Sequence, residues 1–395
     1  MARPVILFLL AAVNFTHIID AMLIMPLGDI FVEQFNIGAE KYSYLVGAYS
    51  FGAFLSSIAG IFFMDRFDRK SALLCLFIGF AIGTFLCSFV SSFETFVILR
   101  FITGCFGGII GSLIFAIVAD LYKFHERGYA MGIIFGAFSA ASVMGIPFSL
   151  WIAATFDWTI PFQVLGALAG VMCIVVALYF PNMTDHLTAK GVRKSNLQIL
   201  KNIYQDSNQV TALTLGAILI LGHYIIIPFI SPVYIKNVGF TQFEISYMFL
   251  FGGLATVISA PIVGRMVDKF GVFPVFLTAL LLSFIPTLVI TNMGASPIWY
   301  ALIFSSLFFV FASSRMISAN TLITAAVGTE TRGSFMSIKA ALQQLSIFAV
   351  TILGGQIVVL NEDQWKNYEI LGILSVLICL ITIPLIKKIK VAEGN

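Results

Sequence analysis

Charged residues are scarce in this sequence. Asp, Glu, Lys and Arg make up only 10% of its 395 residues, whereas a soluble domain carries about a quarter. The hydrophobic share is 59%, and the sequence lacks the ten-residue alternating segments of a membrane β-barrel. The composition therefore excludes an ordinary soluble protein and predicts an all-α integral membrane protein.

Chemical motifs are missing as well. The five cysteines lie inside apolar runs without CxxC spacing, so we expect packing residues and neither a disulfide nor a metal site. No Walker, HExxH or GxSxG pattern occurs, and the loops are too short to house an active site. The sequence thus predicts a protein that is not an enzyme, has no catalytic residue, cofactor or metal, and binds no nucleic acid. A gradient of ions or solute must supply its energy.

Long apolar runs dominate what is present. A membrane-spanning helix needs roughly 20 apolar residues, and about twelve such runs can be placed. Their expected bounds are 5–32, 42–63, 71–91, 94–119, 129–152, 159–180, 209–235, 244–266, 273–292, 297–323, 334–358 and 368–387. We predict an N-terminal six-helix bundle (1–180), a polar cytoplasmic linker (181–208) and a C-terminal six-helix bundle (209–395).

The basic residues indicate an orientation. They collect in the loops on one side of this topology, and the opposite loops hold only Lys41, Lys236 and Lys366. Basic loops stay in the cytoplasm, so both termini are predicted to be cytoplasmic. The four tryptophans then fall near the outer interface, where such rings prefer to lie. We expect a protein of the bacterial inner (plasma) membrane, in contact with lipid.

The two halves repeat each other weakly. The segment around Asp65 reappears around Asp268, at an offset of 203 residues, and Arg127 has a counterpart 205 residues later. At the offset of 203, Asp20 corresponds to His223. Parallel six-helix repeats are one known solution to alternating access in transporters.

Motifs in both halves carry a family resemblance. The loop after the second run is similar to the pattern G-x-L-A-D-R-x-G-R-K of the major facilitator superfamily. Its matching residues are Asp65, Arg66, Arg69 and Lys70, whereas Ile61 and Asp68 stand where that family has glycine. The resemblance covers essentially the whole chain and implies a monomer of two pseudo-symmetric six-helix bundles.

Two further motifs point to a branch of that family. The fourth run opens with Leu99–Gly104, which resembles the family's Arg-bearing fourth-helix motif. The fifth run holds Gly145-Ile146-Pro147, similar to the fifth-helix motif of the drug and sugar efflux (drug:proton antiporter) branch, with Ser149 where glycine is usual. The resemblance implies export of a small organic solute by proton antiport. A proton symporter or a facilitator for uptake of a sugar, organic acid or nucleoside remains an alternative, and so does sodium coupling.

Asp20 and Arg100 are the predicted proton-coupling pair. A rise of about 1.5 Å per residue places them at similar depth in a core of about 30 Å, and the family fold places the first and fourth helices side by side. Ionisable groups at that depth are costly and mark functional sites by default. His17, one turn below Asp20, is a candidate relay. A static ion pair, and a histidine bonded to a neighbouring backbone or hydroxyl group, are the structural alternatives.

A second set of residues is expected to bind substrate. It comprises His223, Arg315, Asn14, Tyr224 and Gln343. If Arg315 and Lys339 face a common cavity, they favour an anionic or carboxylate-bearing substrate. Lys339, close to its helix start, is instead expected to extend toward the interface.

The cytoplasmic loops supply a predicted conformational latch. In the family, the loop acid interacts with a facing helix N-terminus, and its basic partners interact with an acid that ends the fourth span. The resemblance assigns this role to Asp65, Arg66, Arg69, Asp120, Arg127 and Asp268. A separate set of glycines in the fourth run, namely Gly104, Gly107, Gly108 and Gly111, has the spacing that lets helices pack closely.

Overall fold

Twelve helices account for most of the chain. The computed structural model describes residues 3–63, 66–122, 127–184, 196–328, 332–361 and 363–392. Within these ranges, twelve helices are long and apolar enough to cross a membrane, which confirms the predicted all-α membrane architecture. The chain divides into two compact units, one of Met1–Ile24 with Ala48–Asn196 and the other of Met25–Gly47 with Leu197–Asn395.

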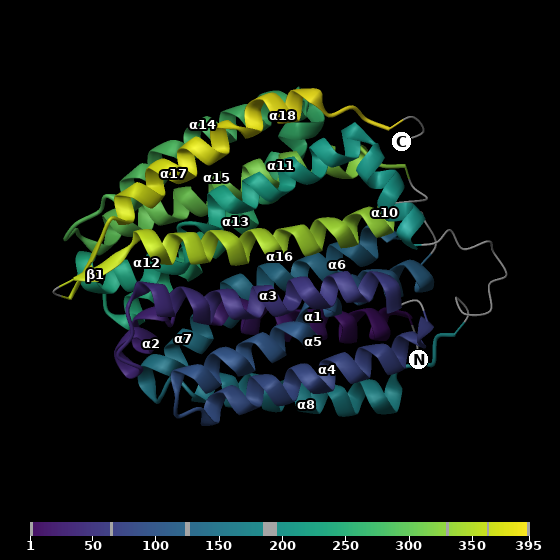
Figure 1. The fold of residues 1–395 in the computed structure, drawn as a ribbon, viewed down its shortest axis with the longest axis horizontal. Helices are drawn as coiled ribbons and strands as arrows, with labels where there is room; N and C mark the ends of the chain where they lie inside the picture. Colours follow the sequence, from purple (N-terminus) through teal and green to yellow (C-terminus); the bar gives the residue numbers. More distant parts are fainter. Residues whose placement is uncertain are drawn as a thin grey trace. The chain divides into compact units, whose positions relative to one another are not determined.

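The first unit is a bundle of long helices. Its elements are α1 (Arg3–Leu23), the greater part of α3 (Ala39–Phe63), α4 (Arg69–Leu86), the 3₁₀ turn η2 (Cys87–Phe89), α5 (Phe93–Leu121), α6 (Arg127–Ala140), the π-helix η4 (Ala141–Gly145), α7 (Ile146–Thr155) and α8 (Ile160–Tyr179). Helices α4, α5 and α8 lie side by side in Figure 1. The apolar core between the helices includes Phe77, Ile110 and Ile114.

Local sequence explains how these helices begin and where one is interrupted. Asp68 caps α4 by accepting hydrogen bonds from Ser71 and from the backbone N–H of Met183. Partial burial acts to raise the pKa of Asp68, but these hydrogen bonds outweigh it and lower the pKa below its ordinary value. The π-helix η4 ends directly before Ile146-Pro147, where the proline has no N–H to continue the ladder.

The second unit contains the remaining elements. They are α2 (Gly28–Gln34), the start of α3, α10 (Asn196–Gln205), α11 (Ser207–Tyr224), α12 (Ile227–Val233), the π-helix η5 (Tyr234–Val238), α13 (Gln242–Phe270), α14 (Val272–Thr291), α15 (Ile298–Ala325), α16 (Arg332–Ile357), β1 (Val359–Asn361), β2 (Gln364–Lys366), α17 (Tyr368–Leu380) and α18 (Thr382–Lys388). The two strands form an antiparallel hairpin in which Leu360 lies opposite Trp365. The apolar core of the second unit contains Leu215, Phe276 and Ile323.

The first and seventh spans are interrupted. A single helix over 5–32 was expected, but α1 ends at Leu23 and a turn containing Pro26 precedes α2. The seventh span breaks in the same way after Tyr224, and Pro228 lies in the first turn of α12. Proline removes a backbone donor and crowds the preceding turn, so the long apolar runs do not continue as one helix.

Side chains in the second unit stabilise these breaks. The Tyr42 hydroxyl donates to the carbonyl oxygens of Met25 at 3.2 Å and Pro228 at 2.8 Å. Nearby, Lys236 forms ion pairs with Glu33 and Asp363. Burial raises the pKa of Asp29 to about 6, against the opposing effect of the Lys236 charge. The interrupted backbone is therefore hydrogen-bonded within the unit.

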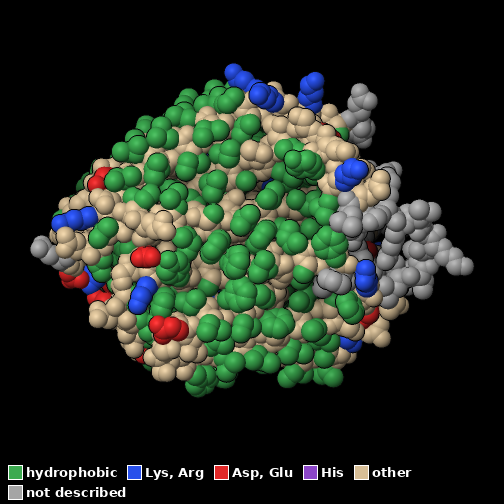
Figure 2. Space-filling model, in the orientation of Figure 1, with side chains coloured by type: hydrophobic (Ala, Val, Ile, Leu, Met, Phe, Trp, Pro, Cys, Tyr) green, Lys and Arg blue, Asp and Glu red, His purple; other side chains and the backbone are tan. Residues whose placement is uncertain are grey.

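Apolar side chains cover the visible surface. On the face drawn in Figure 2, hydrophobic side chains lie over the helices, and charged side chains gather near the helix ends. Large exposed hydrophobic residues include Phe8, Leu178 and Ile258, which are 70%, 71% and 66% exposed. Such a surface suits lipid, because apolar atoms on this scale are unfavourable in water.

Two glycines bring α5 against α3. A Cβ atom added to Gly104 would lie 2.1 Å from the carbonyl oxygen of Tyr49, and one added to Gly108 would lie 2.4 Å from that of Ala53. The packing prediction is therefore confirmed at these two positions. It is wrong for Gly111, which has nothing within 4 Å of its added Cβ.

This contrast gives a matched test of packing. Gly104→Ala should destabilise the protein by about 1–3 kcal/mol, because the added methyl group meets backbone that cannot move cheaply. Gly111→Ala, on the same helix, should be neutral or stabilising by up to about 1 kcal/mol, because alanine favours helix. Thermal unfolding in detergent measures both. Equal melting temperatures for the two variants would contradict the close α3–α5 contact.

Candidate functional site

A buried ion pair links α1 to α5. Arg100 Nη1 donates to Asp20 Oδ2 at 2.9 Å, and Nη2 donates to the main-chain oxygen of Asp20 at 3.1 Å. Both side chains are 0% exposed. The ion pair predicted from the sequence is present in the structure, and its role in coupling stays a prediction.

A third helix contributes to the same carboxylate. The hydroxyl of Thr84, on α4, donates to Asp20 Oδ1 at 3.1 Å. Its neighbour Gly83 allows α4 to pack closely against α5, because a Cβ atom added to Gly83 would lie 2.5 Å from Thr103 Oγ1 on α5. Sequence reasoning missed Thr84, whose only signal is a hydroxyl beside a glycine in an apolar run.

Tyr49 connects this pair to His17. The Arg100 guanidinium lies over the Tyr49 ring, 4.7 Å from its centroid. The Tyr49 hydroxyl and His17 Nε2 are 3.0 Å apart, and His17 Nδ1 is buried without a partner. His17 therefore belongs to the same cluster as Asp20, joined through Tyr49.

The cluster has the chemistry of a protonation site. Burial favours the neutral form of a carboxyl group, whereas a neighbouring guanidinium and donated hydrogen bonds favour its charged form. Asp20 is subject to all three effects at once. A movement of α1 relative to α4 or α5 would therefore change the groups that the carboxylate contacts.

The glycine of the fifth span packs beside this cluster. A Cβ atom on Gly145 would lie 2.3 Å from Cδ1 of Ile19, the residue before Asp20. Gly145 ends the π-helix η4, directly before Pro147 and its α7 helix. The antiporter-like segment and the candidate protonation site therefore adjoin within the first unit.

The residues predicted to bind substrate lie in both units. Asn14 donates to the carbonyl oxygen of Ile134 at 3.2 Å, which ties α1 to α6. His223 stacks on Phe308 with ring centroids 5.3 Å apart and meets Tyr224 edge to face. Gln343 is half-buried on α16.

Two basic side chains are buried in the second unit. Arg315 is 1% exposed, and its Nη1 donates to Ser283 Oγ and Cys379 Sγ, each at 3.2 Å. The expectation that Lys339 extends to the interface is wrong: it is 6% exposed and donates to Asn320 Oδ1 at 2.6 Å. Its side chain packs beside Gly216 of α11, where an added Cβ would lie 3.6 Å from Lys339 Cε.

The predicted latch is only partly visible. Arg69 is buried, and its Nε lies 3.0 Å from Asp120 Oδ2. Arg66 and Asp268 are exposed. Asp65 lies outside the described residues, and Arg127 begins α6 with its side chain outside the described part. Within the described residues, the predicted latch thus consists of the contact between Arg69 and Asp120.

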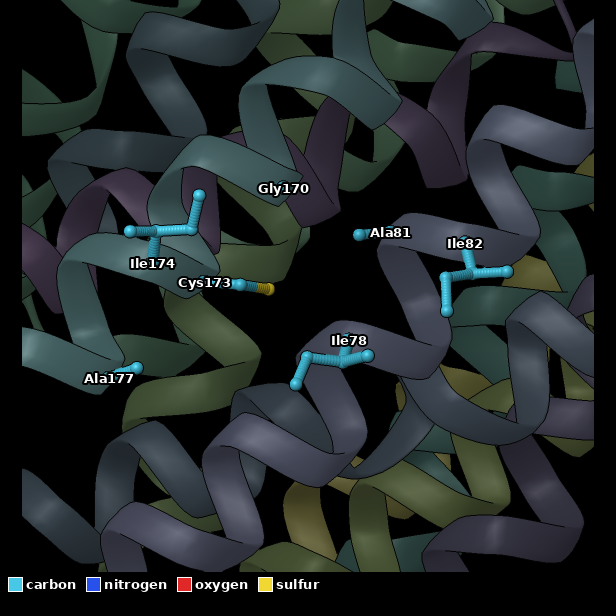
Figure 3. A pocket seen from close by; sticks show the side chains of 7 residues that line it. All are labelled: Ile78, Ala81, Ile82, Gly170, Cys173, Ile174 and Ala177. Atoms are coloured by element: carbon cyan, nitrogen blue, oxygen red, sulfur yellow. The ribbon is translucent and has the colours of Figure 1, made fainter.

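A hollow between α4 and α8 is a poor candidate for a solute site. It encloses about 340 Å³ and is lined by Ile78, Ala81, Ile82, Gly170, Cys173, Ile174 and Ala177 (Figure 3). Its lining offers no charged or hydrogen-bonding side chain other than a thiol. Among the residues that the structure describes, no group of three His, Cys, Asp or Glu side chains is placed to hold a metal ion.

Known proteins resemble this chain in sequence. The sequence model of the Major Facilitator Superfamily matches residues 10–204 and 212–393. The MFS-type transporter YceJ of Bacillus subtilis (strain 168) is 25% identical over 284 residues, which cover 70% of each chain. YhcA of the same organism is 25% identical over 332 residues, 71% of this chain but only 62% of that relative, so under two thirds of its length is spanned.

Solved structures share the fold. A D-xylose–proton symporter superposes with a TM-score of 0.77 at 18% identity, over 98% of this chain and 99% of that chain. A bacterial homologue of the human lysosomal transporter Spinster, facing inward and occupied, gives 0.76 at 14% identity, over 98% and 96%. The twelve spans, the family match and this shared fold agree, so the chain is an integral membrane transporter that belongs to the Major Facilitator Superfamily.

Proposed function

We propose that this transporter exports a small organic solute in exchange for protons, with Asp20 as the protonation site. The observation that carries the proposal is the fully buried Asp20–Arg100 ion pair, inside membrane-spanning helices. A buried ion pair often contributes little net stability, and ionisable groups at such depth mark proton pathways by default. Arg100 is the partner of the carboxyl in this pair, and Tyr49 links the pair to His17.

Antiport is favoured over symport by the fifth span. The Gly145-Ile146-Pro147 segment, which resembles the motif of efflux members, contacts Ile19 next to Asp20. A movement of this segment therefore bears directly on the protonation site. Proton symport or facilitated uptake is the second candidate, in which Asp20 still titrates and the solute moves inward.

The proposal includes a place in the cell and a conformational control. The basic loops support cytoplasmic termini in a bacterial inner membrane, and the family usually works as a single chain.

The ion pair of Arg69 with Asp120 is proposed to stabilise one access state. Its loss then shifts the balance between states more than it alters substrate affinity. We propose two bundles, 1–180 and 209–395, joined by the linker 181–208.

Neutralising Asp20 tests the proposal directly. Purified protein in proteoliposomes with a pH-sensitive dye inside is given sugars, organic acids, nucleosides and cationic drugs. If the protein is an antiporter, a substrate that enters the vesicles is exchanged for protons that leave, so the dye should report a rise in the internal pH. Asp20→Asn should abolish this rise. Glu94→Gln removes an exposed acid from the same unit and should leave the signal intact. Acidification of the lumen would indicate symport, and full coupling in Asp20→Asn would exclude this residue.

Arg100 is expected to set the pH range of transport. Arg100→Gln removes the cation that favours the charged carboxyl, so the half-maximal point of the pH profile should move to higher pH. Removing one partner of a buried pair also costs about 3–5 kcal/mol, which a lower melting temperature reports. The double variant Asp20→Asn/Arg100→Gln should recover part of that loss. A pH profile identical to that of the unaltered protein would contradict the role of the pair.

The latch is tested by labelling. Asp120→Asn leaves Arg69 without its carboxylate, so single cysteines placed on the two sides of the membrane should change their relative labelling rates. Asp157→Asn, an exposed acid hydrogen-bonded to Thr159, is the control. Unchanged labelling ratios in Asp120→Asn, with normal folding, would remove the latch from the mechanism.

A further inference from the structure

Arg315 is a buried cation for which the described chain supplies no anion. Its side chain is 1% exposed on α15, and no carboxylate of the described residues lies within 4 Å of it. Among the side chains that the structure describes, the other two buried arginines, Arg69 and Arg100, are paired with Asp120 and Asp20. Guanidinium groups stay charged, and a buried charge without a partner is strongly unfavourable.

The unused part of the guanidinium has a defined geometry. Nη1 is held by Ser283 of α14 and Cys379 of α17, which fixes the plane of the group. Nε and Nη2 are buried and have no hydrogen-bond partner. These two nitrogens direct parallel N–H bonds from one edge of the guanidinium, which is the fork that binds a carboxylate with two hydrogen bonds.

A second unpartnered polar atom comes from α11. His223 Nδ1 is buried without a hydrogen bond. The ring is held against Phe308, which precedes Arg315 by two turns on α15. Helices α14 and α17 thus hold the Arg315 guanidinium, and α11 packs His223 against the same helix, α15.

The repeat makes the missing anion explicit. In the first unit, α1 supplies Asp20 to the arginine of α5. At the offset of 203 residues, α11 has His223 in place of that aspartate. The second unit therefore has no carboxylate at the position that corresponds to Asp20. Arg315 is not the counterpart of Arg100, because the same offset leads from Arg100 to Ile303.

We propose that Arg315 binds the carboxylate of the transported solute side-on through Nε and Nη2, with His223 Nδ1 as a further contact. The substrate class is then a small organic acid. This inference rests on the proposed transport function and specifies its cargo. The guanidinium is closed to solvent in this structure, so the proposal requires that the access cycle open the site to the solute.

Two ligands of the same shape but different charge show whether binding depends on the carboxylate or on the size of the ligand. Thermal unfolding of the purified protein in low-salt detergent is followed with sodium benzoate, with the neutral isostere benzamide, and with sodium acetate and sodium chloride. Benzoate and acetate should raise the melting temperature with saturation, whereas benzamide should not. Stabilisation by chloride equal to that by benzoate indicates a halide site and overturns the proposal. So does stabilisation by benzamide, or no effect of either carboxylate.

Variants locate the site. Arg315→Gln should weaken benzoate binding about tenfold or more, the scale of a charge-assisted hydrogen bond. Arg315→Lys keeps the charge but lacks the two parallel N–H donors, so its affinity for benzoate should lie between those of Arg315→Gln and the unaltered protein. Lys387→Gln removes a cation near the Phe273 ring of the same unit and should bind as the unaltered protein does. Unchanged affinity in Arg315→Gln overturns the assignment, and if that variant does not fold, Arg315→Lys decides by the same criterion.

This experiment is independent of proton coupling. Binding is measured at equilibrium in detergent, where no gradient exists. Loss of proton movement in Asp20→Asn together with Arg315-dependent benzoate binding supports both proposals. Proton coupling without benzoate binding overturns the substrate class alone, and benzoate binding without proton coupling overturns the antiport proposal alone.

Discussion

The cost of burying charge in a membrane protein organises this structure. Asp20 and Arg100 are both fully buried, and they persist because each satisfies the other and Thr84 completes the carboxylate shell. An arrangement of α1, α4 and α5 that separates the pair would leave an unpaired charge in a medium of low dielectric. Few arrangements of these three helices therefore keep the ion pair intact. A site that is so sensitive to geometry is suited to report and drive a conformational change.

The backbone around this site is shaped by glycine and proline. Gly104 and Gly108 let α5 approach α3 closely, which places Tyr49 against the Arg100 guanidinium. Pro26 and Pro228 mark the interruptions of the first and seventh spans, and they lie six and five residues after the ionisable positions Asp20 and His223. Long helices with local breaks next to their polar groups can change shape there without unpairing the rest of the bundle.

Much of this was accessible from the sequence, because two strong physical constraints act on it. Hydrocarbon thickness sets the length of apolar runs, so the twelve spans could be predicted. The ion pair of Asp20 could be predicted from equal depth together with the family resemblance, which implies that the first and fourth helices are neighbours. Thr84 was missed because a lone hydroxyl in an apolar helix gives no directional signal. Burial of Lys339 was missed because its partner Asn320 lies on another helix, and the sequence does not show how those two helices pack. The β1–β2 hairpin was missed because its strands are only three residues long.

The central claim is that the Asp20 carboxyl changes its protonation state, and infrared difference spectroscopy measures this directly. Spectra of the membrane-reconstituted protein are compared between acidic and neutral pH, and then between the unaltered protein and Asp20→Asn. The account predicts a protonated-carboxyl band that grows on acidification and is missing from the variant, while contributions from other acids such as Asp29 are common to both. The same band in both proteins would contradict it, because the titrating group would then lie elsewhere.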